Sequence, residues 1–184
     1  MNYAEIKYCD IANGPGVRTS LFVSGCTHRC EGCFNKVAWD FRYGRSFDAN
    51  TCDEVIKSCE PYYIAGLTLL GGEPMEPENQ TAVLGIAESF KKAYPQKTIW
   101  CYSGYTYEQL TGKENSRAGT ELAEKILSYV DVLVDGEFEK DKRDITLRFR
   151  GSSNQRLIDV KKTREQGGIV LWRDDPVFET HVME

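Results

Sequence analysis

Residues 24–35 of this 184-residue chain read SGCTHRCEGCFN and place Cys26, Cys30 and Cys33 within eight residues. Thiolates are the protein ligands of iron–sulfur clusters and of zinc, so three sulfurs this close in sequence can bind one inorganic centre. A cubane cluster bound by three cysteines keeps a fourth iron without a protein ligand. The spacing therefore predicts a metal centre with one position open for chemistry.

Two other interpretations fit the same three cysteines. Their i, i+4, i+7 spacing also matches one face of an amphipathic helix, on which they would be buried structural thiols. Against this, the segment contains Gly25, Gly32 and other poor helix formers, and no further apolar residue continues the stripe. A structural zinc site usually has four ligands in paired spacing, and His28 is available to complete a set. Both alternatives stay open, and the iron–sulfur interpretation is preferred.

Short apolar segments alternate with helical patterns on either side of the cysteines. Alternating residues over 17–23 predict a first strand that leads directly into the cysteine loop. Further strands are predicted at 67–70, 98–102, 131–135, 157–160 and 169–172. Helices are predicted from a cap at Asn50 or Thr51 to about Glu60, and over about 78–94 and 119–129. This alternation predicts an α/β fold with a largely parallel sheet and crossover helices.

Glycine-rich or polar residues follow the next three predicted strands, namely Gly71, Gly72, Glu73 and Pro74, then Ser103, then Asp135. Glycines let a ligand approach the backbone closely, and carbonyls with the Glu73 carboxylate can accept hydrogen bonds from an ammonium group. The Ser103 hydroxyl could bind a ribose or a carboxylate, although Ser103 and Asp135 are equally compatible with plain turns. Sites in parallel α/β folds gather at the carboxyl ends of strands, so these residues are expected to share one face with the cysteines.

The C-x3-C-x2-C spacing after a strand resembles the cluster loop of the radical S-adenosylmethionine superfamily. Residues 13–18, NGPGVR, resemble the corresponding segment of activating enzymes for glycyl-radical proteins. Residues 33–36, CFNK, together with Trp39, are similar to the activators of anaerobic ribonucleotide reductases, and RGSSNQR at 150–156 resembles a segment peculiar to those activators. The resemblance extends over most of the chain.

This resemblance implies a partial (β/α)6 radical-SAM barrel, and the six predicted strands are too few for an eight-stranded barrel. The length of the chain predicts a single domain over residues 1–184, of which 173–184, without a periodic pattern, are a possible C-terminal tail. Cys26, Cys30 and Cys33 would bind a 4Fe-4S cluster. S-adenosyl-L-methionine would contact Gly71, Gly72, Glu73, Pro74, Ser103, Asp135 and Asn35. Glu137 stands where the activators often have proline, which leaves the turn after Asp135 open.

The activity that the resemblance implies is that of an oxidoreductase, a glycyl-radical-enzyme activase. Reductive cleavage of S-adenosylmethionine gives a 5'-deoxyadenosyl radical, which removes hydrogen from a backbone glycine of the anaerobic ribonucleoside-triphosphate reductase. The electron would come from a low-potential donor such as flavodoxin or ferredoxin. A short, laterally open barrel suits a polypeptide loop as substrate. Candidates for docking or pocket contacts are Phe34, Asn35, Lys36, Trp39 and Arg156.

Three alternatives to this activity remain. The chain could be a small radical-SAM enzyme that acts on a small molecule, such as a 7-deazaguanine-type synthase. It could activate another glycyl-radical enzyme such as pyruvate formate-lyase, although those chains are usually longer and their cluster loop commonly continues with histidine. It could also be a metal-binding module without enzymatic activity.

Composition limits the setting in which the chain works. A net charge of −5 argues against general nucleic-acid binding by a basic surface. No run of about 18 apolar residues and no signal-peptide pattern is present, so a cytoplasmic protein without a membrane association is expected. Seven cysteines are an odd number, four of them outside the cluster loop, which fits reduced thiols better than a disulfide framework.

Overall fold

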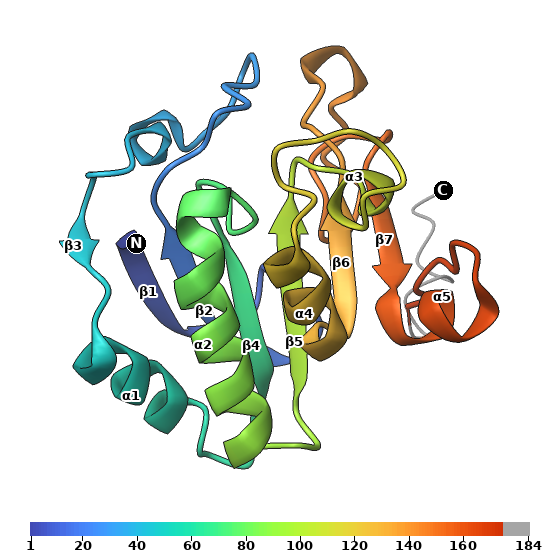
Figure 1. Ribbon diagram of the computed structural model, residues 1–184. Coiled ribbons are helices and arrows are strands. Elements are labelled where there is room, and N and C mark those ends of the chain that lie inside the picture. The colour runs from blue at the N-terminus through green and yellow to red at the C-terminus, as the bar shows by residue number, and fades with distance from the viewer. Residues whose placement is uncertain (175–184) are drawn as a thin grey trace.

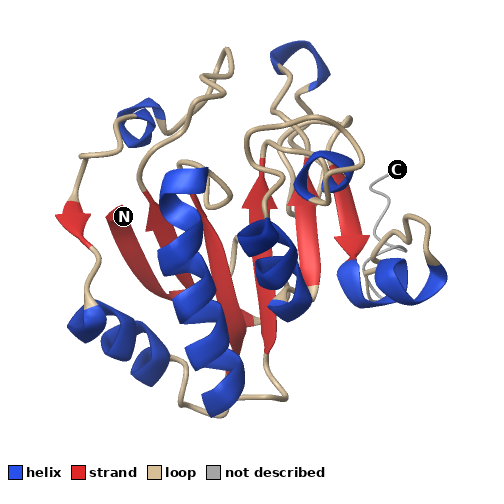
Figure 2. Cartoon of the chain, viewed as in Figure 1, coloured by secondary structure: helices blue, strands red, loops and turns tan. Residues whose placement is uncertain are grey.

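The computed structural model describes residues 1–174. It consists of a seven-stranded sheet with helices on one of its faces (Figure 1; Figure 2). The strands are β1 Asn2–Asp10, β2 Val17–Val23, β3 Arg45–Ser46, β4 Ile64–Gly71, β5 Thr98–Ser103, β6 Val132–Asp135 and β7 Arg156–Asp159. The α-helices are α1 Ala49–Ser58, α2 Pro77–Ala93, α3 Tyr107–Leu110, α4 Glu121–Tyr129 and α5 Val160–Gln166. Two 3-10 helices are η1 Lys36–Trp39 and η2 Lys140–Lys142.

The strand order is β3-β1-β2-β4-β5-β6-β7. The four central strands β2, β4, β5 and β6 are parallel, whereas β1, β3 and β7 pair antiparallel with their neighbours. Crossovers between the parallel strands place α1, α2 and α4 on the same face of the sheet (Figure 1). The predicted α/β class and the parallel centre of the sheet are confirmed.

Each face of the sheet carries its own apolar cluster, because successive side chains of a strand point to opposite sides. Leu69 and Cys101 belong to the main core beneath the helices. Trp100 and Val134 lie on the opposite face, where Phe149 and Trp172 pack against them. Phe149 and Trp172, which cover part of this second face, both come from the chain that follows β6.

The strands β1 and β3, at one side of the sheet, are absent from the sequence-based prediction. Pairing of β1 with β2 shifts register between Tyr3 and Glu5 and again between Lys7 and Asp10, so the side chains of β1 do not alternate regularly.

The predicted cap of α1 at Asn50 or Thr51 is wrong. Asp48 is the cap, because its side chain accepts a hydrogen bond from the Thr51 amide. The helix also ends before Glu60, at Ser58.

Residues 169–172 do not form the predicted sixth strand. The chain reverses at Gly167, which is in the left-handed conformation after α5, and then lies beside β7 with one antiparallel bridge between Ile158 and Leu171. Trp172 packs edge-on against Trp100 at 4.9 Å between ring centroids.

Residues 175–184 of the possible tail at 173–184 lie outside the described residues. Among residues 1–174, no helix has the length and apolar character needed to cross a bilayer.

Candidate functional site

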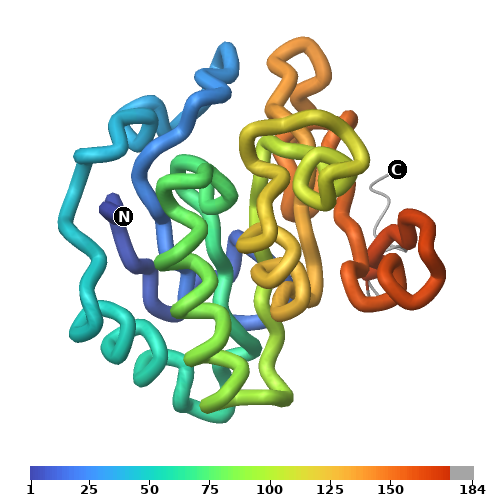
Figure 3. The backbone as a smooth tube through the Cα atoms, viewed as in Figure 1, coloured from blue at the N-terminus to red at the C-terminus, as the bar shows by residue number. Residues whose placement is uncertain are grey.

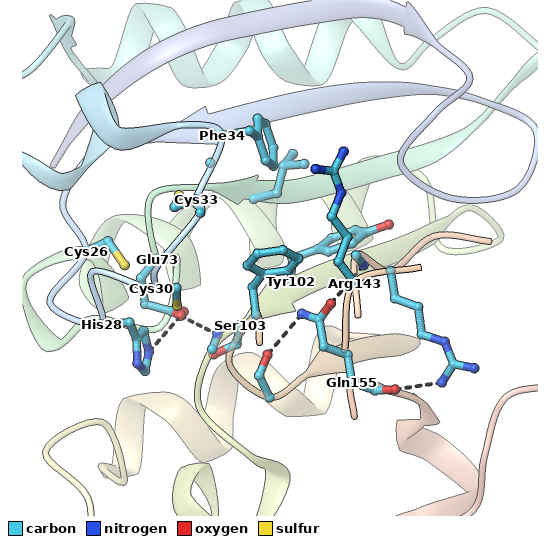
Figure 4. Close-up of a pocket in the computed structure, with 18 of the residues that line it drawn as sticks. Cys26, His28, Cys30, Cys33, Phe34, Glu73, Tyr102, Ser103, Arg143 and Gln155 are labelled. Atoms are coloured by element: carbon cyan, nitrogen blue, oxygen red, sulfur yellow. Dashed lines mark hydrogen bonds and ion pairs between the residues drawn. The ribbon is translucent and has the colours of Figure 1, made fainter. Parts of the chain in front are cut away.

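A cavity of about 650 Å³ opens beside the carboxyl ends of β4 and β5 (Figure 4). Figure 3 shows the loop after β2 and the segment after β6 rising at the same end of the molecule. The predicted metal and cofactor ligands that line this cavity are Cys26, Cys30, Cys33, Gly71, Gly72, Glu73 and Ser103. Phe34 and Trp39, predicted as docking or pocket contacts, line it as well. Within the described chain, Asn35, Pro74 and Asp135 are not among its lining residues.

All three cysteines of the loop are free thiols of intermediate exposure. Burial, and then the nearby charge of Glu73, raises the pKa of Cys26 to about 12. Burial also raises the pKa of Cys30. A thiol in such surroundings ionises when a metal supplies compensating positive charge, so the donor set fits a metal centre better than a free reactive thiolate.

The arrangement does not fit a single ion. No group of three or more His, Cys, Asp or Glu side chains within residues 1–174 is placed to hold one metal ion. A zinc ion with Zn–S distances of about 2.3 Å needs its sulfurs roughly 3.8 Å apart. A cubane cluster is larger, and its ligands lie farther apart than those of one ion. Three thiols around one cavity therefore fit the cluster better than they fit zinc.

The turn after β4 fixes the cysteine loop through backbone and carboxylate contacts. The Glu73 amide donates to the Gly25 carbonyl at 2.8 Å. The buried Glu76 carboxylate accepts from both the amide and the hydroxyl of Thr27, at 2.7 and 2.6 Å. Gly72 lies so close to the loop that a Cβ atom there would be 2.6 Å from the Gly25 carbonyl oxygen. The loop and the turn thus form one packed unit.

The Glu73 carboxylate is almost fully buried and already has protein donors. One oxygen accepts from the Met75 amide at 2.8 Å, and the other accepts from the Gly104 amide at 2.6 Å. This second oxygen also lies 3.3 Å from His28 Nε2. Glu73 therefore joins the end of β4 to the end of β5, and a ligand ammonium would have to share its oxygens.

His28 lies between two carboxylates. Its Nδ1 atom is 2.8 Å from Glu137 Oε1, opposite the contact of Nε2 with Glu73. Burial would lower the pKa of His28, but hydrogen bonding and charge from Glu73, and then from Glu137, raise it to about 9. A ring with both nitrogens facing carboxylates is not available as the fourth ligand of a zinc site. The sequence alone suggests no other role for His28.

Ser103 and Asp135 have structural partners of their own. The Ser103 hydroxyl accepts from the Tyr105 amide at 3.1 Å. The buried Asp135 carboxylate accepts from the Tyr107 amide at 2.7 Å and from Arg156 at 2.9 and 2.5 Å. Arg156 also pairs with Glu108 at 2.6 Å, beside a separate smaller cavity. The Asp135–Arg156 pair closes β6 against β7, away from the cysteines.

Comparison with known proteins adds the family to this geometry. Residues 12–158 match the family described as 4Fe-4S single cluster domain. The anaerobic ribonucleoside-triphosphate reductase-activating protein of Enterobacteria phage T4 is 42% identical over 157 residues, which cover 85% of this chain and 93% of the relative. The proteins of the same name from Pasteurella multocida (43%, 84% of this chain and 95% of the relative) and Escherichia coli K12 (37%, 84% and 96%) are similarly related.

The chain belongs to this activating-protein family. The resemblance drawn from the cysteine loop and its flanking residues is confirmed. Because the alignments cover nearly the whole of each relative, the likeness concerns the complete activating protein and not a shared cluster motif alone.

The outer wall of the cavity was only partly foreseen from the sequence, because of its residues only Arg150, Gly151 and Gln155 belong to the segment 150–156 that resembles the activators. Residues from the segment after β6 form it: Phe138, Arg143, Asp144, Ile145, Leu147, Phe149, Arg150, Gly151 and Gln155. No periodic pattern marks this segment, because its position depends on contacts such as Phe149 against Trp100 at 5.3 Å. Phe34, predicted to contact a partner, lies at the cavity and is 92% exposed, and Ile145 on the opposite segment is 86% exposed.

Proposed function

We propose that this chain is a radical S-adenosylmethionine activase that generates a glycyl radical on the anaerobic ribonucleoside-triphosphate reductase. The observation that carries the proposal is the placement of Cys26, Cys30 and Cys33 around one cavity with the turn that follows β4. The names of the relatives supply the target, and the match to a 4Fe-4S single cluster family supplies the metal centre.

Cys26, Cys30 and Cys33 would hold three irons of a 4Fe-4S cluster. Gly71, Gly72, Glu73 and Ser103 would bind S-adenosylmethionine in the same cavity, with Pro74, Asp135 and Asn35 as further predicted contacts. When bound, the reduced cluster supplies the electron that cleaves S-adenosylmethionine to methionine and a 5'-deoxyadenosyl radical, which takes a hydrogen atom from the substrate glycine. The protein's own contribution is to position these groups and to exclude water, because hydrogen-atom transfer needs no side chain as an acid or base.

The shape of the cavity supports a polypeptide as substrate. The wall formed by residues 138–155 leaves an opening flanked by the exposed apolar side chains of Phe34 and Ile145. Exposed apolar residues around a concave site are typical of a surface that a protein partner covers. This favours insertion of a loop of the reductase over enclosure of a small molecule.

The proposal extends to the fold and the setting of the protein. The sheet, with its parallel centre and the cavity on one side, is interpreted as the family's partial barrel in one domain over residues 1–184. The acidic net charge and the free thiols of the described residues support a reducing, cytoplasmic location without nucleic-acid or membrane binding. A flavodoxin or a ferredoxin is the proposed class of electron donor.

Anaerobic reconstitution followed by electron paramagnetic resonance tests the function. The reduced protein, mixed with S-adenosylmethionine and the reductase, is expected to give a glycyl-radical doublet on the reductase. Alanine at any one of Cys26, Cys30 or Cys33 should abolish both cleavage and doublet, whereas Cys9→Ser, at an exposed thiol on β1, should change neither. Cleavage without a doublet would reject the reductase as target and favour another glycyl-radical enzyme or a small-molecule substrate. A colourless protein that contains zinc would reject the enzyme altogether.

A further inference from the structure

We infer that His28 is a positioning residue, which fixes the middle of the cysteine loop against the turn after β4 and against the segment after β6. The inference rests on the proposed function, because it concerns where the thiols of the loop lie relative to the proposed S-adenosylmethionine site. Nothing in the spacing of the cysteines requires a histidine between them. The reason for this residue is found in its contacts.

His28 connects three parts of the site that are distant in sequence. It belongs to the loop after β2, while Glu73 follows β4 and Glu137 follows β6. Its Nε2 atom lies 3.3 Å from Glu73 Oε2 (Figure 4). Its Nδ1 atom lies 2.8 Å from Glu137 Oε1, and its side chain is only 7% exposed. The hydrogen bond of Nδ1 to Glu137 and the ion pair of Nε2 with the buried Glu73 carboxylate hold the three segments together, since separating the ring from Glu73 would leave two buried polar groups apart.

Packing against the ring also restricts His28, in addition to its hydrogen bond to Glu137 and its ion pair with Glu73. The Tyr105 ring lies 4.3 Å away between centroids, at an interplanar angle of 59°. The chain passes on another side at Gly104, where a Cβ atom would be 2.6 Å from His28 Cδ2 and 2.7 Å from Nε2. Glycine at position 104 thus provides the space that the imidazole occupies. Gly104 also donates to the Glu73 oxygen that faces the ring, so one compact unit contains all four groups.

The cysteine loop needs such a contact because it has no regular structure of its own. No helix or strand lies between β2 and η1, and Arg29, next to His28, has a positive φ of 51°. Sites that bind metals and cofactors lose affinity when the groups that orient their ligands are removed, typically by 10–100-fold. Loss of the His28 contacts is therefore expected to disturb the relation between the thiols and the Gly71–Gly72 turn before it disturbs the global fold.

The test is a double-mutant cycle on His28 and Gly104, read by S-adenosylmethionine affinity of the reconstituted protein and by amide exchange of residues 25–33 in the metal-free protein. His28→Ala is expected to weaken binding about 10-fold and to speed exchange in the loop. Gly104→Ala alone should have a similar effect, because its methyl group displaces the ring. The double variant should be no worse than His28→Ala, since the methyl group then fills vacated space. His28→Gln, which keeps a donor towards Glu73, should recover part of the affinity.

A surface contact in the same loop provides the matched control. Glu31 pairs with Lys140 at 2.6 Å and links the same two segments, but both side chains are exposed. Glu31→Gln is expected to leave affinity and loop exchange unchanged. Unchanged affinity and exchange in His28→Ala, or fully additive losses in the double variant, would overturn the inference. If the wild-type protein bound no cluster, the proposed function would fail, while exchange in the metal-free protein would still decide the role of His28.

Discussion

Arg117 pairs with two glutamates that differ in burial, and the difference provides a test of how the cysteine loop is anchored. Glu76 is fully buried, lies 3.0 Å from Arg117 Nη1 and accepts two hydrogen bonds from Thr27. The side chain of Glu78 is 50% exposed and lies 2.6 Å from Arg117 Nη2. Glu76→Gln and Glu78→Gln each remove one charge with little change of shape, so the two variants differ mainly in what the carboxylate contacts.

The expected cost follows from these contacts. A hydrogen bond to a charged group contributes about 1.5–3 kcal/mol, against about 0.5–1.5 kcal/mol for a neutral pair. Glu76→Gln weakens two such bonds to Thr27 and turns an amide donor towards Arg117, so a loss of about 2–3 kcal/mol in the free energy of unfolding is expected. Glu78→Gln breaks a surface pair, which is worth about 0–1 kcal/mol.

Urea unfolding of the reduced, metal-free protein measures this difference. With a denaturant slope of about 2 kcal/mol per molar, Glu76→Gln should lower the midpoint by about 1 M, and Glu78→Gln by less than about 0.5 M. Amide exchange at Thr27 should accelerate only in Glu76→Gln. Equal midpoint shifts for the two variants, or unchanged protection of Thr27, would refute the conclusion that Glu76 anchors the loop.

Phe34→Ala is expected to raise the KM for the reductase more than it lowers kcat, because the ring lies exposed at the cavity. The measurement is the activation rate over a range of reductase concentrations. A change confined to kcat would contradict a role of Phe34 in docking. Thr120→Val should cost about 1–2 kcal/mol, since the hydroxyl caps α4 and donates to Gln80 at 2.5 Å, whereas Thr120→Ser should stay near wild type in the same urea assay. Arg18→Lys should cost roughly 2–4 kcal/mol, because the buried guanidinium donates to Thr68, to Thr98 and to strand carbonyls that one ammonium cannot reach together. A midpoint within 0.3 M of wild type, about 0.6 kcal/mol, would contradict the last expectation.

Local patterns predicted the parts of the fold that local physics determines. The parallel strands β2, β4, β5 and β6 carry apolar residues between glycine, proline or polar boundaries, and these features are visible in a single sequence. Strand β1 was not predicted because its two register shifts break the alternation that identifies a strand. The segment at 169–172 has a good strand composition, but its place beside β7 and over Trp100 is a tertiary outcome.

The candidate site divides in the same way. The cysteines and the turn at 71–74 are recognisable by spacing, because a cluster and a tight turn both impose local rules. The role inferred for His28 depends on Glu137, which is 109 residues away, and no spacing within the loop reveals it. Asp135 was correctly placed at the end of a strand, but its nearest partner is Arg156, on a strand whose antiparallel pairing brings the two side chains together.

The glycine pair after β4 shows why a sequence signature and its physical cause can differ. From the sequence, Gly71 and Gly72 are expected to let a ligand approach the backbone closely. In the structure, the position that a Cβ atom of Gly72 would take is already crowded by the carbonyl oxygens of Gly25 and Ala38, at 2.6 and 2.8 Å. The chain itself therefore requires glycine at position 72, before any ligand binds. Because Gly25 lies next to Cys26, the same lack of a side chain that would admit S-adenosylmethionine also lets the cysteine loop rest directly on the turn.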